Sequence, residues 1–208
     1  MASSDLQHIQ QECARVLDTA LTAAQKPLVF GEGYSKKPIL MLVGEAPGAQ
    51  EVIEGRPFVG KAGKNLDGFL TALGLTREEI YISNVVKIRP TREGKTGRIC
   101  NRPPTREEIL LFQPWLMREV LIIKPKALVT LGNVALHAFM PLQDTIGSCH
   151  GKWQTAIVRD GDTESRTIPL FALYHPASII YRAELKEVYQ NDLEALRDSL
   201  YQGGQNDT

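Results

Sequence analysis

The stretch "PILMLVGEAPGAQEVIEGRPFVGKAG" (residues 38–63) joins an apolar run to a glycine-rich loop. The run at 38–43 is typical of a strand that is buried within a sheet. The loop at 44–63 contains five glycines and two prolines, and Glu45 stands at its start. Glycine lets the backbone approach a ligand closely, and proline stiffens the chain. The loop has neither the spacing of a dinucleotide fingerprint nor that of a P-loop, so a phosphate cradle is disfavoured.

Strands and helices alternate along the chain on both sides of this stretch. Buried strands are expected at 39–43, 80–86, 127–132 and 170–176. Helices are expected at about 5–24, 61–73, 105–123, 133–140 and 177–200, with a hairpin-like segment at 151–170. This alternation predicts an α/β fold, namely a three-layer α/β/α sandwich around a mainly parallel four-stranded sheet. We expect a single domain over residues 1–202, including the N-terminal helix, and a disordered tail at 203–208.

The composition is ordinary for a globular chain. Its 208 residues carry 24 basic and 24 acidic side chains, so a polyanionic partner must be met by a local basic patch. No apolar run approaches the roughly 18 residues of a membrane helix, and the first residues lack the order of a signal peptide. We therefore expect a cytoplasmic protein with no membrane partner. Cys13, Cys100 and Cys149 are widely spaced, which predicts free thiols and too few ligands for a closed zinc site.

One segment supplies a basic patch. Residues 84–106 contain seven basic side chains and a single acid, Glu93. Such a cluster on its own is ordinarily a solvated loop. The alternative is a surface that follows the phosphates of a nucleic acid, where each contact adds salt-dependent affinity.

The four strand ends carry polar groups of different kinds. Glu45 follows the first strand, Asn133 follows the third, and Asn84 and His175 lie near the ends of the second and fourth. Each of these alone is more often a turn or cap residue. In open α/β sheets, however, ligands bind beyond the carboxyl ends of the strands. Together these residues predict a pocket, and Phe58 in the glycine-rich loop is either a core residue or a ring for stacking on a flat heterocycle.

Seven blocks of the sequence, in the same order, resemble the family 4, iron–sulfur type of uracil-DNA glycosylases. The blocks are "LVFGEG" (28–33), "VGEAPGAQEVIEGRPFVGKAG" (43–63), "YISNVVKIRP" (81–90), "NRPPTREE" (101–108), "KPKALVTLGNVA" (124–135), "GKW" (151–153) and "HPASIIYR" (175–182). The resemblance implies a hydrolase that cleaves the N-glycosidic bond of deoxyuridine in DNA, releases uracil and starts base excision repair. Such an enzyme extrudes its target base from the stack.

The resemblance also implies roles for individual residues. Asn84 would read the Watson–Crick edge of uracil, and Phe58 would stack on the ring. His175 would bond the uracil O2 and stabilise the charge on the departing base. Glu45 would orient or activate the attacking water. The remaining expected substrate contacts are Ala46, Gly48 and Glu51.

The expected partner is uracil-containing DNA, single- or double-stranded, bound by a monomer. The segment 178–182 resembles a loop that probes the minor groove and wedges into the vacated stack. The basic segment then becomes a DNA-backbone surface. The expected DNA contacts are Lys87, Arg89, Arg92, Lys95, Arg98, Arg102, Ser178, Ile179, Ile180 and Arg182.

The sequence departs from the family at the cluster cysteines. The N-terminal pair is represented only by Cys13, with Val16 three residues later, and Ile88 and Phe112 stand at two other ligand positions. Apolar side chains cannot replace thiolates as cluster ligands. We therefore expect no iron–sulfur cluster and no other cofactor, with Ile88 and Phe112 packed in a small hydrophobic core instead. A second departure is the insert at 91–100, where Cys100 is more simply an incidental thiol than a nucleophile.

Two other functions remain open. One is a glycosylase of the same fold that removes another deaminated base, such as hypoxanthine or xanthine. The other is a DNA-binding accessory module that has lost catalysis, although the joint presence of Glu45, Asn84 and His175 argues against it. A flavodoxin-like nucleotide binder is disfavoured because no phosphate-binding signature is present.

Overall fold

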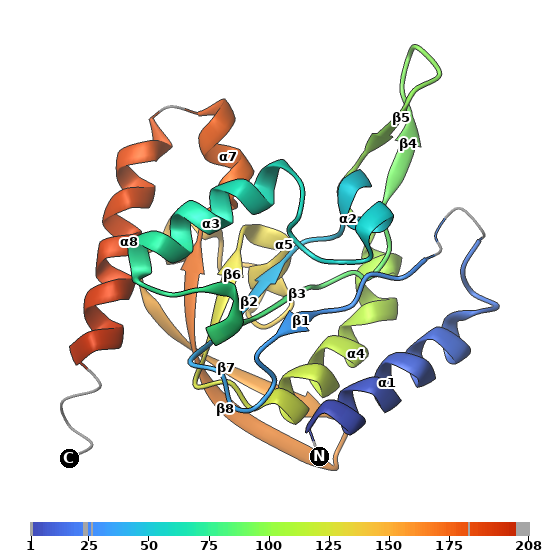
Figure 1. Ribbon diagram of the computed structural model, residues 1–208, viewed down its shortest axis with the longest axis horizontal. Coiled ribbons are helices and arrows are strands. Elements are labelled where there is room, and N and C mark those ends of the chain that lie inside the picture. Colours follow the sequence, from blue (N-terminus) through green and yellow to red (C-terminus); the bar gives the residue numbers. More distant parts are fainter. Residues whose placement is uncertain (1, 23–24, 26, 183, 203–208) are drawn as a thin grey trace.

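The computed structural model describes residues 2–22, 25, 27–182 and 184–202, apart from the side chains of 2, 3, 179–181 and 202. It shows a six-stranded sheet between two layers of helices (Figure 1). The order across the sheet is β1 (Glu32–Gly33), β3 (Tyr81–Asn84), β2 (Leu40–Gly44), β6 (Ala127–Leu131), β8 (Glu164–Leu173) and β7 (Trp153–Asp160). The four central strands are parallel, and the two edge strands are antiparallel to their neighbours. The predicted mainly parallel sheet is confirmed, but it has six strands and not four.

The helices form one layer on each face of the sheet. One layer contains α1 (Ala2–Leu17), α4 (Arg106–Ile123), α5 (Asn133–His137) and α6 (Ile146–Cys149). The opposite layer contains α3 (Lys61–Leu73) and α8 (Leu185–Gln202), with α7 (Pro176–Tyr181) beside them (Figure 1). This confirms the predicted three-layer sandwich. Across the described ranges, no helix is long and apolar enough to cross a membrane.

Several element boundaries differ from the sequence-based prediction. Helix α1 ends at Leu17, and the predicted closing helix is two helices, α7 and α8. The predicted basic loop contains a hairpin of β4 (Thr91–Glu93) and β5 (Ile99–Asn101), which forms a separate two-stranded sheet. Two short elements, α2 (Ala49–Glu54) and the 3-10 helix η2 (Arg77–Glu79), were not expected. The predicted tail at 203–208 lies outside the described residues.

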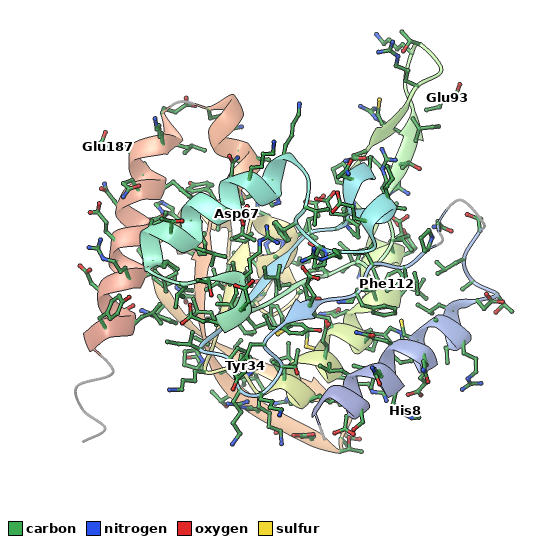
Figure 2. The ribbon with its side chains drawn as sticks, in the orientation of Figure 1. His8, Tyr34, Asp67, Glu93, Phe112 and Glu187 are labelled. Atoms are coloured by element: carbon green, nitrogen blue, oxygen red, sulfur yellow. The ribbon has the colours of Figure 1, made fainter. Side chains whose placement is uncertain are left out.

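The β4–β5 hairpin projects from the body of the molecule. Figure 2 shows Glu93 on this projection, whereas Phe112 of α4 lies inside the body. All residues of β5 are exposed, and the hairpin contributes nothing to either hydrophobic cluster of the described residues. An isolated two-stranded hairpin is marginally stable in water. Its position therefore depends on the bonds at its base.

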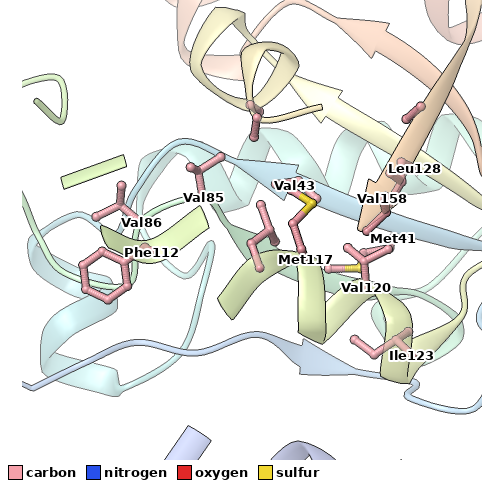
Figure 3. Close-up of a cluster of buried hydrophobic side chains, with 14 of the residues drawn as sticks. Met41, Val43, Val85, Val86, Phe112, Met117, Val120, Ile123, Leu128 and Val158 are labelled. Carbon is pink, nitrogen blue, oxygen red and sulfur yellow. The ribbon is translucent and has the colours of Figure 1, made fainter. Parts of the chain in front are cut away.

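Side chains of β2 alternate between the two layers. Met41 and Val43 belong to the cluster beneath α4, and Leu40 and Leu42 belong to the cluster beneath α3. Figure 3 shows Met41 and Val43 with Met117 and Val120 of α4 in the first cluster. Successive side chains of a strand point to opposite faces, so a strand covered on both sides must be apolar throughout. This explains the uninterrupted apolar run that precedes the glycine-rich loop.

A buried ion pair joins the segment that follows β3 to α4. The Lys87 ammonium, with only 1% of the side chain exposed, donates to Glu119 Oε2 at 2.7 Å and to the Asn84 carbonyl at 2.9 Å. Glu119 also accepts from the hydroxyls of Tyr81, at 2.9 Å, and Ser83, at 2.8 Å. The prediction that Lys87 contacts DNA is therefore wrong, because its charge is enclosed in the protein and already paired.

We predict that Lys87→Met lowers the free energy of unfolding by about 3–5 kcal/mol, because it leaves the Glu119 carboxylate buried without its cation. Urea denaturation measures this loss. The matched control is Lys124→Met, which removes a half-exposed partner of Glu164 at 3.9 Å and should change stability by about 1 kcal/mol or less. The double variant Lys87→Met/Glu119→Gln should be more stable than Lys87→Met. Equal losses of stability in Lys87→Met and Lys124→Met would contradict the conclusion that Lys87 is the buried cation of Glu119.

Candidate active site

A cavity of about 420 Å³ opens at the carboxyl ends of the parallel strands. Its size lies within the range of small-molecule sites. It collects residues from the glycine-rich loop, the end of β3, the end of β5 and the start of α7. The predicted site residues that line it are Ala46, Gly48, Glu51, Phe58, Asn84 and His175. The expectation that ligands bind beyond the carboxyl ends of the strands thus located the cavity. Asn133, however, does not line the cavity, and the Asn133 Oδ1 accepts from the Ile146 N–H at 2.8 Å.

Asn84 is the last residue of β3 and pairs with Gly44 of β2 in the parallel register. Its side chain is nearly enclosed, with the residue 3% exposed, and lines the cavity. Among the described residues, the Asn84 amide group has no hydrogen-bond partner. A Cβ at Gly44 would lie 2.5 Å from both Asn84 Oδ1 and the Phe58 ring, so any other residue at this end of β2 would displace one of these two side chains. A buried amide without a partner is costly, and it is satisfied if a ligand bonds to it.

His175 follows β8 and caps the N-terminus of α7. Its Nδ1 accepts a hydrogen bond from the Ala177 backbone N–H at 3.1 Å. Because a backbone N–H can only donate, Nδ1 carries no proton and the neutral ring carries its proton on Nε2. Burial lowers the pKa of His175, which also favours the neutral ring. The site therefore presents a neutral N–H donor at Nε2.

Phe58 is a core residue whose ring also lines the cavity. It is 4% exposed and packs in the cluster beneath α3, and it also lines the cavity. Its ring lies 6.3 Å from the His175 ring, centroid to centroid, at an interplanar angle of 28°. The cavity thus has a flat apolar wall next to the imidazole, as a planar heterocycle requires.

Glu45 is half-buried at the start of the glycine-rich loop, next to the lining residue Ala46 but not itself in the lining. Burial raises the pKa of its carboxyl group. Within the described residues its carboxylate has no hydrogen bond or ion pair. If Glu45 were an ordinary surface charge, Arg56 of the same loop could pair with it. Arg56 is instead bonded to Glu32 through two nitrogens at 2.8 and 3.0 Å. A carboxylate with a raised pKa and no partner is suited to accept a proton.

Glu51 holds the loop together. Its Oε2 accepts from the Gly48 N–H at 3.1 Å, and its Oε1 accepts from the Gly60 N–H at 2.8 Å. Both oxygens are thus used by backbone groups from the two ends of the loop. The predicted place of Glu51 in the cavity wall is matched by the structure, but its bonds are those of a scaffold.

Sequence reasoning did not single out Asn101, which also lines the cavity. It is the last residue of β5, and its Oδ1 accepts from Arg89 Nε at 2.8 Å. The base of the hairpin therefore reaches the cavity. The "NRPP" block that begins with Asn101 was the available signal, but the residue lay among basic neighbours that drew attention to charge.

The predicted DNA-binding residues fall into two groups. Arg92, Lys95 and Arg98 are exposed on the projecting hairpin, and Arg182 is exposed after α7, with Ser178 half-exposed. Arg102, by contrast, is held by Glu108 through two bonds of 2.7 Å and donates to the Thr91 carbonyl at 3.0 Å. The side chains of Ile179 and Ile180 lie outside the described residues.

The residues at the positions of the family's iron–sulfur ligands cannot hold an iron–sulfur group. Ile88 and Phe112 are fully buried in the cluster beneath α4, as predicted, and Cys13 is buried in the same cluster. Burial raises the pKa of the Cys13 thiol to about 12, which disfavours the thiolate that a metal needs. In the part of the chain that the structure describes, no group of three or more His, Cys, Asp or Glu side chains could hold a metal ion.

Comparison with known proteins identifies the family of this chain. The family model of the Uracil DNA glycosylase superfamily matches residues 30–197. A type-4 uracil-DNA glycosylase of Archaeoglobus fulgidus is 38% identical over 172 residues, covering 81% of this chain and 79% of that protein. Type-4 enzymes of Saccharolobus solfataricus and Pyrobaculum aerophilum are each 35% identical, covering 94% and 91% of this chain and 87% and 91% of their own lengths. On the match over residues 30–197 and these relatives, the chain belongs to the uracil-DNA glycosylase superfamily.

Proposed function

We propose that this chain is a uracil-DNA glycosylase that hydrolyses the N-glycosidic bond of deoxyuridine in DNA and so starts base excision repair. Four relatives that match over 81–94% of the chain are type-4 uracil-DNA glycosylases. The observation that carries the proposal is the Asn84 amide, which is nearly buried, has no partner within the described protein and lines a cavity with room for a nucleobase. The target base must leave the stack to reach it.

The cavity can bind uracil through complementary groups. The Asn84 amide offers one donor and one acceptor together, which match the O4 and N3–H of uracil. Phe58 provides the flat wall for the ring. His175 donates from Nε2 to the uracil O2. A neutral imidazole suffices for this role, because a preorganised donor stabilises the negative charge that develops on the base.

Hydrolysis then follows with Glu45 as the proton acceptor. The C1′–N1 bond breaks and its electron pair leaves with uracil, while a water oxygen bonds to C1′ and a water proton passes to the Glu45 carboxylate. The negative charge of Glu45 also attracts the positive charge that develops on the sugar. Its raised pKa makes it a better proton acceptor than an ordinary glutamate.

DNA is the partner in this proposal, and the hairpin supplies part of its surface. Arg92, Lys95 and Arg98 are exposed on an arm whose base, Asn101, lines the cavity. A DNA strand that inserts a nucleobase into the cavity would pass close to the hairpin. The proposal retains three expectations from the sequence: a monomer, a cytoplasmic location and no membrane partner.

We also propose that the enzyme acts without an iron–sulfur cluster, since Ile88, Phe112 and Cys13 form packed core at the cluster position. Purified protein should contain far less than one iron per chain and show no broad visible absorbance, measured by metal analysis and spectroscopy. Stoichiometric iron with a brown colour would overturn this expectation.

The function is tested with oligonucleotides that carry uracil, hypoxanthine or xanthine, followed by alkaline cleavage of abasic sites. The wild type should cleave only the uracil strand. Asn84→Ala and His175→Ala should each lower the single-turnover rate by about 10²–10³-fold, because each removes a preorganised polar group.

The matched control is Asn133→Ala, an asparagine at another strand exit that does not line the cavity, and it should retain the rate of the wild type. Cleavage of hypoxanthine or xanthine strands instead of uracil would favour the altered-specificity glycosylase. Binding without cleavage of any strand would favour the accessory module.

The DNA surface is tested by the salt dependence of binding to uracil-free single-stranded DNA. Replacing Arg92, Lys95 and Arg98 together with Gln should reduce the slope of log K against log salt concentration by about 0.7 for each phosphate that these side chains neutralise. The control variant replaces Lys36, Lys37 and Lys126, which are exposed near the amino ends of β2 and β6, away from the cavity. Equal slopes for the two variants would exclude the hairpin as a phosphate-binding surface.

A further inference from the structure

We infer that Arg77 is a positioning residue that fixes Phe58 in the cavity wall, and this inference rests on the proposed function. The starting observation is the backbone of Phe58, whose φ is +53°. Residues other than glycine rarely adopt this left-handed conformation, and a bulky side chain makes it less favourable still. Such a conformation persists only when the surrounding structure enforces it.

Arg77 supplies the enforcing contact. Its Nη2 donates to the Phe58 carbonyl at 2.6 Å and to the Gly63 carbonyl at 3.4 Å, and its Nε donates to Asp67 Oδ1 at 2.7 Å. The planar guanidinium therefore ties the loop to the first turns of α3. Gly63 completes the fit, since a Cβ at this position would overlap the Phe58 carbonyl. The Phe58 carbonyl is thus bonded by Arg77, and the missing side chain of Gly63 leaves the space that this carbonyl occupies.

The position of the Phe58 ring follows from this carbonyl. The ring lies against Gly44 and near His175, so rotation of the Phe58 peptide would move it away from the place where a base must stack. Arg77 itself is not in the cavity lining. It lines a separate cavity of about 320 Å³ on the surface, with Arg56, Lys64 and Asp67. Arg77 therefore does not touch a base in the cavity, and its shortest bond to a residue of the cavity wall is the one to the Phe58 carbonyl.

The ion pair between Arg77 and Asp67 is not by itself a sufficient reason for an arginine at this position. Its two side chains are 24% and 58% exposed, and ion pairs of this kind contribute little to stability. Arg56 forms a comparable surface pair with Glu32 and lines the same separate cavity, but it makes no bond to Phe58. Arg56 is thus a matched control.

The test compares Arg77→Ala with Arg56→Ala. We expect Arg77→Ala to lower the single-turnover excision rate and to weaken inhibition by free uracil, each by about tenfold or more, because small displacements of a positioned group are costly. Arg56→Ala should change neither. In a Phe58→Leu background, Arg77→Ala should have no further effect on inhibition by uracil, since no ring remains to be held. Millimolar guanidinium, which can enter the vacated surface cavity, should restore part of the rate to Arg77→Ala but none to Phe58→Leu.

Hydrogen exchange of the peptide segment 57–63 gives a readout that does not depend on activity. Exchange should be faster in Arg77→Ala than in the wild type or Arg56→Ala. Arg77→Lys, which keeps the charge and one donor, should fall between them and serves if Arg77→Ala does not fold. Equal effects of the two alanine variants, or an Arg77→Ala effect that persists undiminished in the Phe58→Leu background, would overturn the inference. If the wild type leaves uracil in DNA, the proposed function fails, while the exchange data still decide whether Arg77 holds this loop.

Discussion

The ion pair between Lys87 and Glu119 lies directly behind the strand end that carries Asn84. Lys87 bonds the Asn84 carbonyl, and Glu119 bonds the hydroxyls of Tyr81 and Ser83 in the same strand. The end of β3 is therefore fixed to α4 before any ligand arrives. A buried pair of this kind gives little net stability, but it allows few alternative arrangements. The orientation of the Asn84 side chain at the cavity depends on this constraint.

The charged and polar groups in and around the cavity are of two kinds. Those that build the loop are fully paired within the protein: Glu51 with two backbone N–H groups, and Arg77 with two carbonyls and a carboxylate. Those that face the expected reaction, Glu45 and the Asn84 amide, have no partner among the described residues. The unpaired groups at this end of the sheet thus lie where a substrate can satisfy them.

Much of this arrangement could be predicted from the sequence. The polar residues at the ends of the strands placed Asn84 and His175 at one cavity, although they also suggested Asn133, which lies outside its lining. The place of Phe58 beside them came from the resemblance to the family. The buried role of Lys87 could not be predicted, because its partner Glu119 lies 32 residues away and both look like surface charges. Arg77 and Asn101 were missed for a similar reason, since their roles depend on contacts with distant backbone and cavity. The two-residue strand β1 and the β4–β5 hairpin were missed because they are too short or too charged to show alternation.

The β4–β5 hairpin has a consequence for how this protein could change over time. Its two ends are fastened to each other, by the Arg102 N–H on the Pro90 carbonyl and by Arg89 on Asn101, and neither strand enters the hydrophobic clusters. Lengthening or replacing the tip would therefore leave the register of the main sheet undisturbed. Such an arm is a separable module: under the proposed function, substitutions at its tip can change contacts with nucleic acid while the residues at the strand ends stay the same.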